Sequence, residues 1–248
     1  MARQNVILFG LDFETTGTVD PYPVQACLVM RQNGTDRVLL NTLVKPRKPI
    51  EPEASRVHGI TDEAVVHAPD EAVVAWTITT LIRAYTRDVD GTVQQGFFLV
   101  TFNGANFDVP LLDSLVPHPL QAHAIPLPHI DVLRFARHYF PEVKGTNGGK
   151  TLGELYHIFT NKPLSSAHDA AVDVLGTLEL LEAMRIKAGV TIWQLAEEQR
   201  RPKPYAVMPI GKYTGTPIDE IPKSWAHFML DKDLDQDLRA TVEYILQR

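Results

Sequence analysis

Two carboxylates stand one residue apart at the end of an apolar run near the start of the chain. The apolar segment 6–11 predicts a buried strand, and Asp12 and Glu14 follow it directly. Strand side chains alternate between faces, so both acids should point one way and Phe13 the other. Like charges about 4 Å apart repel by on the order of 4 kcal/mol at an effective dielectric of roughly 20, and Mg²⁺ or Mn²⁺ would offset this repulsion. A solvated acidic turn is the alternative.

Two more acids occupy positions from which they could face the same strand end. Asp108 lies in the first turn of a helix predicted over 106–115, soon after a strand predicted over 96–102. Asp173 lies inside a long helix predicted to end near residue 187. Taken alone, Asp108 is also explained as an acid that the helix dipole favours at an N-terminus.

A histidine accompanies the last of these acids. His168 precedes Asp173 by five residues, which would place the two about 140° apart on a helix. We therefore expect His168 to reach the site from a loop or first turn, while Asp173 points in from the helix. Asp169 and Asp131 are expected to be helix caps. Three other histidines have no predicted partner: His118, His123 and His138.

The elements that must position these residues include both strands and helices. Ranges 21–30 and 37–44 are predicted to be strands joined by a hairpin turn at Asn33-Gly34, giving three antiparallel strands with the first. Asn106 is the expected N-cap of its helix, and the Gly-rich range 145–149 is expected to be mobile. Further helices are predicted near 61 and over 71–86, 130–140, 151–159 and from 191. This order indicates a mixed sheet with helices on its faces.

Composition narrows the classes of protein that fit. The chain has 248 residues and is 44% hydrophobic, which suffices for a large core, and no stretch predicts secretion or membrane insertion. Cys27 is the single cysteine, which excludes an intrachain disulfide and a multi-cysteine zinc site and fits a reducing cytoplasm. A net charge of −6 argues against a protein that coats nucleic acid by charge alone. It leaves a nuclease open, because bound cations would add positive charge at the site.

Three segments together resemble the motifs of the DEDDh, or DnaQ-like, 3′-5′ exonucleases. They are LDFETTG, FNGANFDVPLL and HDAAVD, and EASRVHGIT is similar to a segment that proofreading members carry between the first two. The resemblance covers about residues 5–190 and implies an α/β, ribonuclease H-like fold with a mixed five-stranded sheet flanked by helices. Asn103 precedes Asp108 by five residues, with Gly104 inserted, and this spacing is similar to the TREX-type enzymes.

The resemblance also implies a role for each acid. Asp12, Glu14 and Asp173 would hold the metal that activates the attacking water, Asp12 would also bridge to a second metal, and Asp108 would support the pair. His168 would be the general base, because imidazole accepts a proton at neutral pH. The cofactors would be two divalent ions, Mg²⁺ or Mn²⁺.

Substrate contacts are implied around the same motifs. Ile60 would wedge against a base of the terminal nucleotide; the alternative is that Thr61, Asp62 and Glu63 only begin a helix. The full set of implied substrate-binding residues is Phe13, Thr15, Thr16, His58, Gly59, Ile60, Asn103 and Phe107.

The chain divides into a predicted exonuclease domain over 1–195, a charged, Pro-containing linker over 196–207 and a small α-rich module over 208–248. The module resembles that of exodeoxyribonuclease X in its Gly-Lys-x-x-Gly turn and Pro-led helix. Lys212, Tyr213 and Lys223 could contact DNA there. A module that only packs on the catalytic domain is the alternative.

The sequence therefore predicts a cytoplasmic, metal-dependent 3′-5′ exodeoxyribonuclease that releases nucleoside 5′-monophosphates from DNA 3′ ends. Its expected partner is single-stranded DNA or a frayed duplex, with no membrane partner and an undetermined polymerase partner. An exoribonuclease using the same site and a catalytically silent nucleic-acid-binding adaptor are the alternatives.

Overall fold

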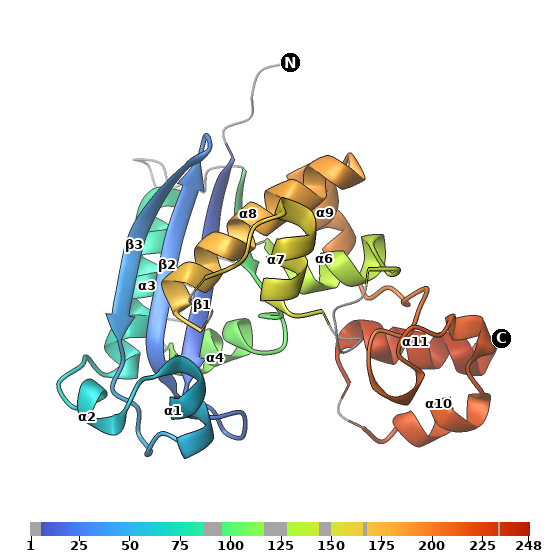
Figure 1. Ribbon diagram of the computed structural model, residues 1–248, viewed down its shortest axis with the longest axis horizontal. Coiled ribbons are helices and arrows are strands. Elements are labelled where there is room, and N and C mark those ends of the chain that lie inside the picture. Colours follow the sequence, from blue (N-terminus) through green and yellow to red (C-terminus); the bar gives the residue numbers. More distant parts are fainter. Residues whose placement is uncertain (1–5, 87–95, 117–127, 144–149, 166–167, 233) are drawn as a thin grey trace.

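A computed structural model describes residues 6–86, 96–116, 128–143, 150–165, 168–232 and 234–248. Within these ranges, one mixed sheet holds five strands in the order β3-β2-β1-β4-β5 (Figure 1). Antiparallel pairing joins the first three strands, and β4 and β5 continue the sheet parallel to β1. The strands are β1 (Ile7–Thr15), β2 (Pro23–Gln32), β3 (Thr35–Leu43), β4 (Phe97–Thr101) and β5 (His129–Asp131). The predicted mixed five-stranded sheet is confirmed.

The predicted hairpin at Asn33-Gly34 is also confirmed. Both residues have left-handed backbone, with φ of 52° and 78°, and they join Gln32 of β2 to its partner Thr35 of β3. Two consecutive positive φ angles match the right-handed twist of the flanking strands, which is why Asn-Gly suits this turn.

Helices cover both faces of the sheet. Helix α3 (Glu71–Thr86) lies against one face and α8 (Ala170–Ala188) against the other, where α6 (Val132–Tyr139) and α7 (Leu152–Thr160) pack beside α8 (Figure 1). Helix α4 (Asp108–Leu115) packs on the same side as α3. Alternation along β1 serves both layers, because Phe9 and Phe13 enter the core beneath α3 while Leu8 enters the core beneath α8. Asp12 and Glu14 therefore share the face that α8 covers, as predicted.

A glycine sets the distance between α8 and β1. A Cβ at position 10 would lie 2.5 Å from Val174 Cγ1, closer than real Cβ contacts, and 3.1 Å from Leu178 Cδ1, which is a tight contact. Gly10 therefore allows the helix to rest on the strand backbone. Since Val174 directly follows Asp173, this contact also fixes how far the acid of α8 lies from the acids of β1.

Three local predictions were wrong or incomplete. Helix α1 (Pro52–His58) precedes the predicted α2 (Asp62–Val65), and Pro52 suits its first turn, where no backbone donor is needed. The helix predicted over 130–140 begins two residues later, as α6, because Ile130 and Asp131 belong to the short β5. Asn106 is not an N-cap, because α4 begins only at Asp108. Before it, Phe107 N and Val109 N both donate to Gly104 O and form a turn.

The C-terminal residues form a small cluster of their own. Helix α9 (Ile192–Gln199) includes the first four residues of the predicted linker. It is followed by η1 (Gly211–Tyr213), η2 (Ile218–Glu220), α10 (Lys223–Met229) and α11 (Gln236–Gln247). Apolar side chains from the last four elements and the preceding segment pack together, among them Tyr205, Met208, Ile218, Ile221, Leu238, Val242 and Ile245.

His138 has a partner that the sequence did not indicate, since its Nε2 lies 2.8 Å from Asp237 Oδ2. The positions of His118, His123 and the predicted mobile range 145–149 lie outside the described residues. Among those that are described, every helix is too short or too polar to span a bilayer.

We predict that Gly10→Ala destabilises the protein by about 1–3 kcal/mol, because the added methyl group overpacks the contact with Val174. Thermal and urea melts of the single variants and of Gly10→Ala with Val174→Ala measure this, and the pair should show favourable coupling. Gly153→Ala is the matched control, since no atom lies within 4 Å of its added Cβ and α7 would gain a better helix former. Equal melting of the two glycine variants would contradict the steric role.

Candidate active site

Four carboxylates meet where β1 ends and two helices begin. Asp12 and Glu14 lie near the carboxyl end of β1, Asp108 is the first residue of α4, and Asp173 lies in the first turn of α8. Ligand atoms of Glu14, His168 and Asp173 all lie within 4.8 Å of one another. The predicted acids and the predicted histidine are thus assembled from three distant segments.

Asp108 is tied directly to the strand that carries the first two acids. Its side chain is 3% exposed, and Oδ1 accepts a hydrogen bond of 3.1 Å from Phe13 N, the residue between Asp12 and Glu14. A Cβ on Gly104 would lie 2.7 Å from Asp108 Oδ2 and 2.2 Å from Thr101 Oγ1. The inserted glycine in this motif is therefore a steric requirement of the buried carboxylate.

His168 approaches from the turn before α8, as predicted. It has left-handed backbone with φ of 71°, and its N–H donates to Asp173 Oδ2 at 3.1 Å. Asp169 caps α8 by accepting from Ala171 N and Val172 N, so its predicted capping role is confirmed. The backbone of the turn and the first acid of the helix thus hold each other in place.

Burial and mutual repulsion make this cluster electrostatically costly. Burial, followed by the charges of Asp108, Glu14 and Asp173, raises the pKa of Asp12 well above its usual value. Burial first and then Asp173 raise the pKa of Glu14 to about 7. Burial also raises the pKa of Asp108 to about 7, although the hydrogen bond from Phe13 opposes this. Burial is likewise the main reason why the pKa of Asp173 is raised.

These residues fit a divalent cation. In the described part of the chain, Asp173 Oδ1 is a buried carboxylate oxygen without a hydrogen-bond partner, in the same cluster as Glu14 and His168. An unpartnered buried anion is costly, and oxygen-rich sites suit Mg²⁺ and Mn²⁺. Positive charge would reverse the upward shifts in the pKa of all four acids.

Several predicted substrate contacts are occupied in folding the site. Phe13 is buried beneath α3. The Thr15 hydroxyl donates to Gly17 O at 3.0 Å, and the fully buried Thr16 hydroxyl accepts from Tyr22 N at 3.2 Å. These side chains shape the turn after β1, and their contact with substrate stays a prediction.

The segment 58–60 is likewise tied to β1. His58 Nδ1 accepts from Ile60 N at 3.0 Å, so the ring proton lies on Nε2, which donates to Thr15 O at 3.2 Å. Burial lowers the pKa of His58, in keeping with this neutral form. Gly59 caps α1 with φ of 75°. Ile60 is only 8% exposed and packs with Val24, Ile50 and Val65, which favours a packing role over the predicted wedge.

The remaining predicted contacts lie on the loop before α4. Asn103 is exposed with φ of 62°, and Phe107 is half-buried as the residue before α4. Asp131 caps α6 as predicted, but it has a second role that the sequence did not reveal. Its oxygens also accept from Asn103 N at 3.1 Å and from Ala105 N at 3.0 Å. Its position directly before a helix indicated a cap and gave no sign of this loop.

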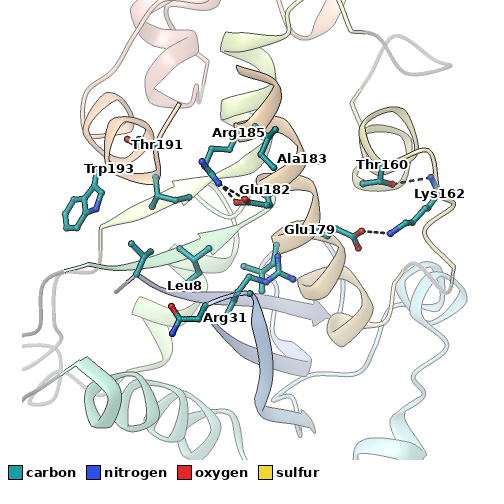
Figure 2. Close-up of a pocket in the computed structure, with 16 residues that line it drawn as sticks. Leu8, Arg31, Thr160, Lys162, Glu179, Glu182, Ala183, Arg185, Thr191 and Trp193 are labelled. Atoms are coloured by element: carbon teal, nitrogen blue, oxygen red, sulfur yellow. Dashed lines mark hydrogen bonds and ion pairs between the residues drawn. The ribbon is translucent and has the colours of Figure 1, made fainter. Parts of the chain in front are cut away.

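A cavity of about 780 Å³ lies at the opposite ends of the same elements (Figure 2). The start of β1, the β2–β3 hairpin, the carboxyl half of α8 and the start of α9 line it. Its charged residues pair with one another or close by, as Lys162 does with Glu179 at 2.8 Å and Arg185 with Glu182 at 2.5 Å. We therefore assign the chemistry to the carboxylate cluster.

Comparisons with known proteins agree with this geometry. The family model described as Exonuclease matches residues 9–181. An uncharacterized exonuclease of Escherichia phage 186 is 39% identical over 106 residues, which span 41% of this chain and 45% of the phage protein. Exodeoxyribonuclease 10 of Escherichia coli is 24% identical over 214 residues, or 84% of both chains.

Solved structures show the same fold. Exonuclease I matches with a TM-score of 0.57 and 19% identity, over 79% of this chain and 44% of its own. Exonuclease X in complex with 5′ overhanging duplex DNA matches with a TM-score of 0.55 and 25% identity, over 77% of this chain and 98% of its own. The chain thus spans less than half of the phage protein and of exonuclease I, but most of exonuclease X.

We predict that the metal-free protein loses stability as pH rises from about 4 toward 7. Carboxyls with a pKa of about 7 in the folded state, such as Glu14 and Asp108, lose their protons in the unfolded chain first, near pH 4. Their stabilisation is complete below pH about 4 and is lost as pH passes about 7. Mn²⁺ should therefore raise the melting temperature more at pH 8 than at pH 5.5.

Melting curves in EDTA and in Mn²⁺, for wild type and Asp12→Asn, test this expectation. The variant removes one charge from the cluster and should melt above wild type in EDTA at pH 8, with a smaller shift on adding Mn²⁺. A wild-type protein that becomes more stable relative to Asp12→Asn between pH 5.5 and 8 in EDTA would contradict the electrostatics.

Proposed function

The chain belongs to the exonuclease family, and from this premise we propose that it is a metal-dependent 3′-5′ exodeoxyribonuclease. The observation that carries the proposal is the meeting of Asp12, Glu14, Asp108 and Asp173 beside His168 at one end of the sheet. Two-metal phosphodiester hydrolysis, which proceeds without a covalent nucleophile, uses such a carboxylate set and a base.

Each side chain would have a distinct task. Asp12, Glu14 and Asp173 would hold one divalent ion, and Asp12 with Asp108 would hold a second. Two bound ions supply positive charge that favours deprotonation of water and offsets charge on the leaving oxygen. The exposed His168 would take the proton from the attacking water. The bond between phosphorus and the 3′ oxygen of the preceding nucleotide would then break, the 3′ oxygen would take a proton from solvent to become a hydroxyl, and a nucleoside 5′-monophosphate would be released.

DNA is the proposed substrate on two grounds. The alignment with exodeoxyribonuclease 10 extends over 84% of the chain, and exonuclease X, whose structure contains duplex DNA, matches over 98% of its own length.

The single cysteine, Cys27, is fully buried and suits the cytoplasm, which we propose as the place of action.

Two of the three DNA contacts predicted in the C-terminal module involve side chains that already have partners within it. Lys223 Nζ donates to Leu246 O at 3.0 Å, and the ring of Tyr213 packs edge-on against Trp225 at 5.7 Å. Both are engaged within the module, which supports the packing role. Lys212 is exposed beside the Tyr213 ring and is the best candidate of the three for a phosphate contact.

We predict that the wild-type protein shortens 5′-labelled DNA stepwise and releases mononucleotides from 3′-labelled DNA with Mg²⁺ or Mn²⁺, and is inactive in EDTA. Asp12→Asn should lower the rate by more than about a hundred-fold, because even outer partners of metal ligands cost 10–100-fold. Asp36→Asn, an exposed acid of β3, is the matched control. Single-stranded DNA, duplex DNA and RNA are compared in parallel. Full activity of Asp12→Asn, activity in EDTA, or a preference for RNA would contradict the proposal.

We further predict that His168→Ala lowers kcat by about 10²–10⁴-fold, as loss of a general base does. The Mn²⁺-induced rise in melting temperature should persist, since the four carboxylates remain. Imidazole added to the buffer should restore part of the rate in the variant and none in Asp12→Asn. A variant that loses its Mn²⁺ shift would identify His168 as a metal ligand instead, and an undiminished rate would reject both roles.

A further inference from the structure

Three successive backbone donors hold the loop that leads into Asp108. Asn103 N donates to Asp131 Oδ1 at 3.1 Å, Gly104 N to Thr101 Oγ1 at 3.1 Å, and Ala105 N to Asp131 Oδ2 at 3.0 Å. Asp131 is 3% exposed and therefore binds the loop as a buried acceptor. Gly104 O in turn accepts from two backbone donors at the start of α4. The position of the loop therefore sets the position of the first turn of that helix.

Asp131 is itself clamped by α9. Its N–H donates to Gln199 Oε1 at 2.8 Å, and its carbonyl accepts from Gln199 Nε2 at 3.1 Å. One amide side chain thus satisfies both backbone groups of Asp131 at the end of β5. This fixes the backbone from which the Asp131 carboxylate reaches the loop.

The C-terminal module contacts the same region through a buried ion pair between Asp237 and Arg134. Arg134 is 8% exposed, and its Nε and Nη2 donate to Asp237 of α11 at 2.5 and 2.8 Å. The guanidinium also donates to Gln199 O and to Arg201 O, while Arg134 N donates to Asp131 Oδ1. Burial alone would raise the pKa of Asp237, but hydrogen bonds from His138 and Arg134 outweigh it and hold that pKa below its usual value.

From these contacts we propose that Asp131 and Gln199 are positioning residues, through which the C-terminal module holds the Asp108 loop in its working geometry. The proposal rests on the proposed function for its effect on rate. It assigns the module a task at the active site that needs no contact with DNA. Removing the whole module is a poor test, because it would leave Arg134 as a buried cation without Asp237.

Asp131→Asn tests the loop contact in the full-length protein. An asparagine keeps the shape and remains a good N-cap, but its amide nitrogen would face one of the loop N–H donors. We expect kcat to fall about 10–100-fold and Mn²⁺ affinity to weaken about ten-fold, with KM for the oligonucleotide within about three-fold. Asp219→Asn is the matched control, since it makes the same change in the same module at an exposed carboxylate that accepts from the Tyr244 hydroxyl at 3.2 Å, away from Asp237 and the loop.

Gln199→Ala and Asp237→Asn extend the test along the chain of contacts. Both should weaken Mn²⁺ binding and lower kcat in the same direction as Asp131→Asn, and each should be non-additive with it. Circular dichroism establishes that each variant is folded. Folded Asp131→Asn and Gln199→Ala proteins with wild-type kcat and Mn²⁺ affinity would overturn the proposal, as would a change in KM alone. If the wild type proved to lack nuclease activity, the proposed function would fail, and the Mn²⁺ titration would still decide the positioning role.

Discussion

Helix α8 lies closer to strand β1 than a side chain would allow, and the candidate site depends on this contact. Asp12 and Glu14 come from the strand, whereas Asp173 comes from the helix one residue before Val174, which rests over Gly10. Moving the helix outward by the thickness of a methyl group would separate the acids. The packing of α8 on β1 and the spacing of the carboxylates therefore depend on the same feature, which is the lack of a Cβ at Gly10.

Two of the acids are also held by backbone N–H groups of neighbouring residues in the site. Asp108 accepts from Phe13 N, between the two acids of β1, and Asp173 accepts from His168 N. Repulsion among the carboxylates is thus resisted by hydrogen bonds to rigid main chain, which costs little side-chain entropy. An array prepared in this way suits ligands that arrive with positive charge, because the protein need not rearrange to receive them.

Local pattern predicted the elements whose signals lie within a few residues. The range 71–86 has helical spacing of apolar residues, and Asn33-Gly34 has the backbone preference that its hairpin needs. Contacts between residues far apart in the sequence could not be predicted from local pattern. The burial of Ile60 is one example, because nothing next to it in the sequence shows that Val24 and Ile50 pack with it. The capping role of Asp131 could be predicted from the helix that follows it. Its hydrogen bonds to the loop could not, since the donors at 103 and 105 lie more than twenty residues away.

The backbone of His168 carries one further implication. Its φ of 71° lies in the left-handed region, which glycine adopts without steric cost and which asparagine, aspartate and histidine adopt more often than other residues with a side chain. Glycine would therefore suit this turn better than histidine, but glycine could not take the proton that we propose His168 takes. At this turn the preference of the backbone conflicts with the proposed role of the side chain, so selection for stability alone would favour replacing the histidine. Under the role proposed for His168, laboratory selection for thermal stability alone would tend to give a well-folded protein with lower activity.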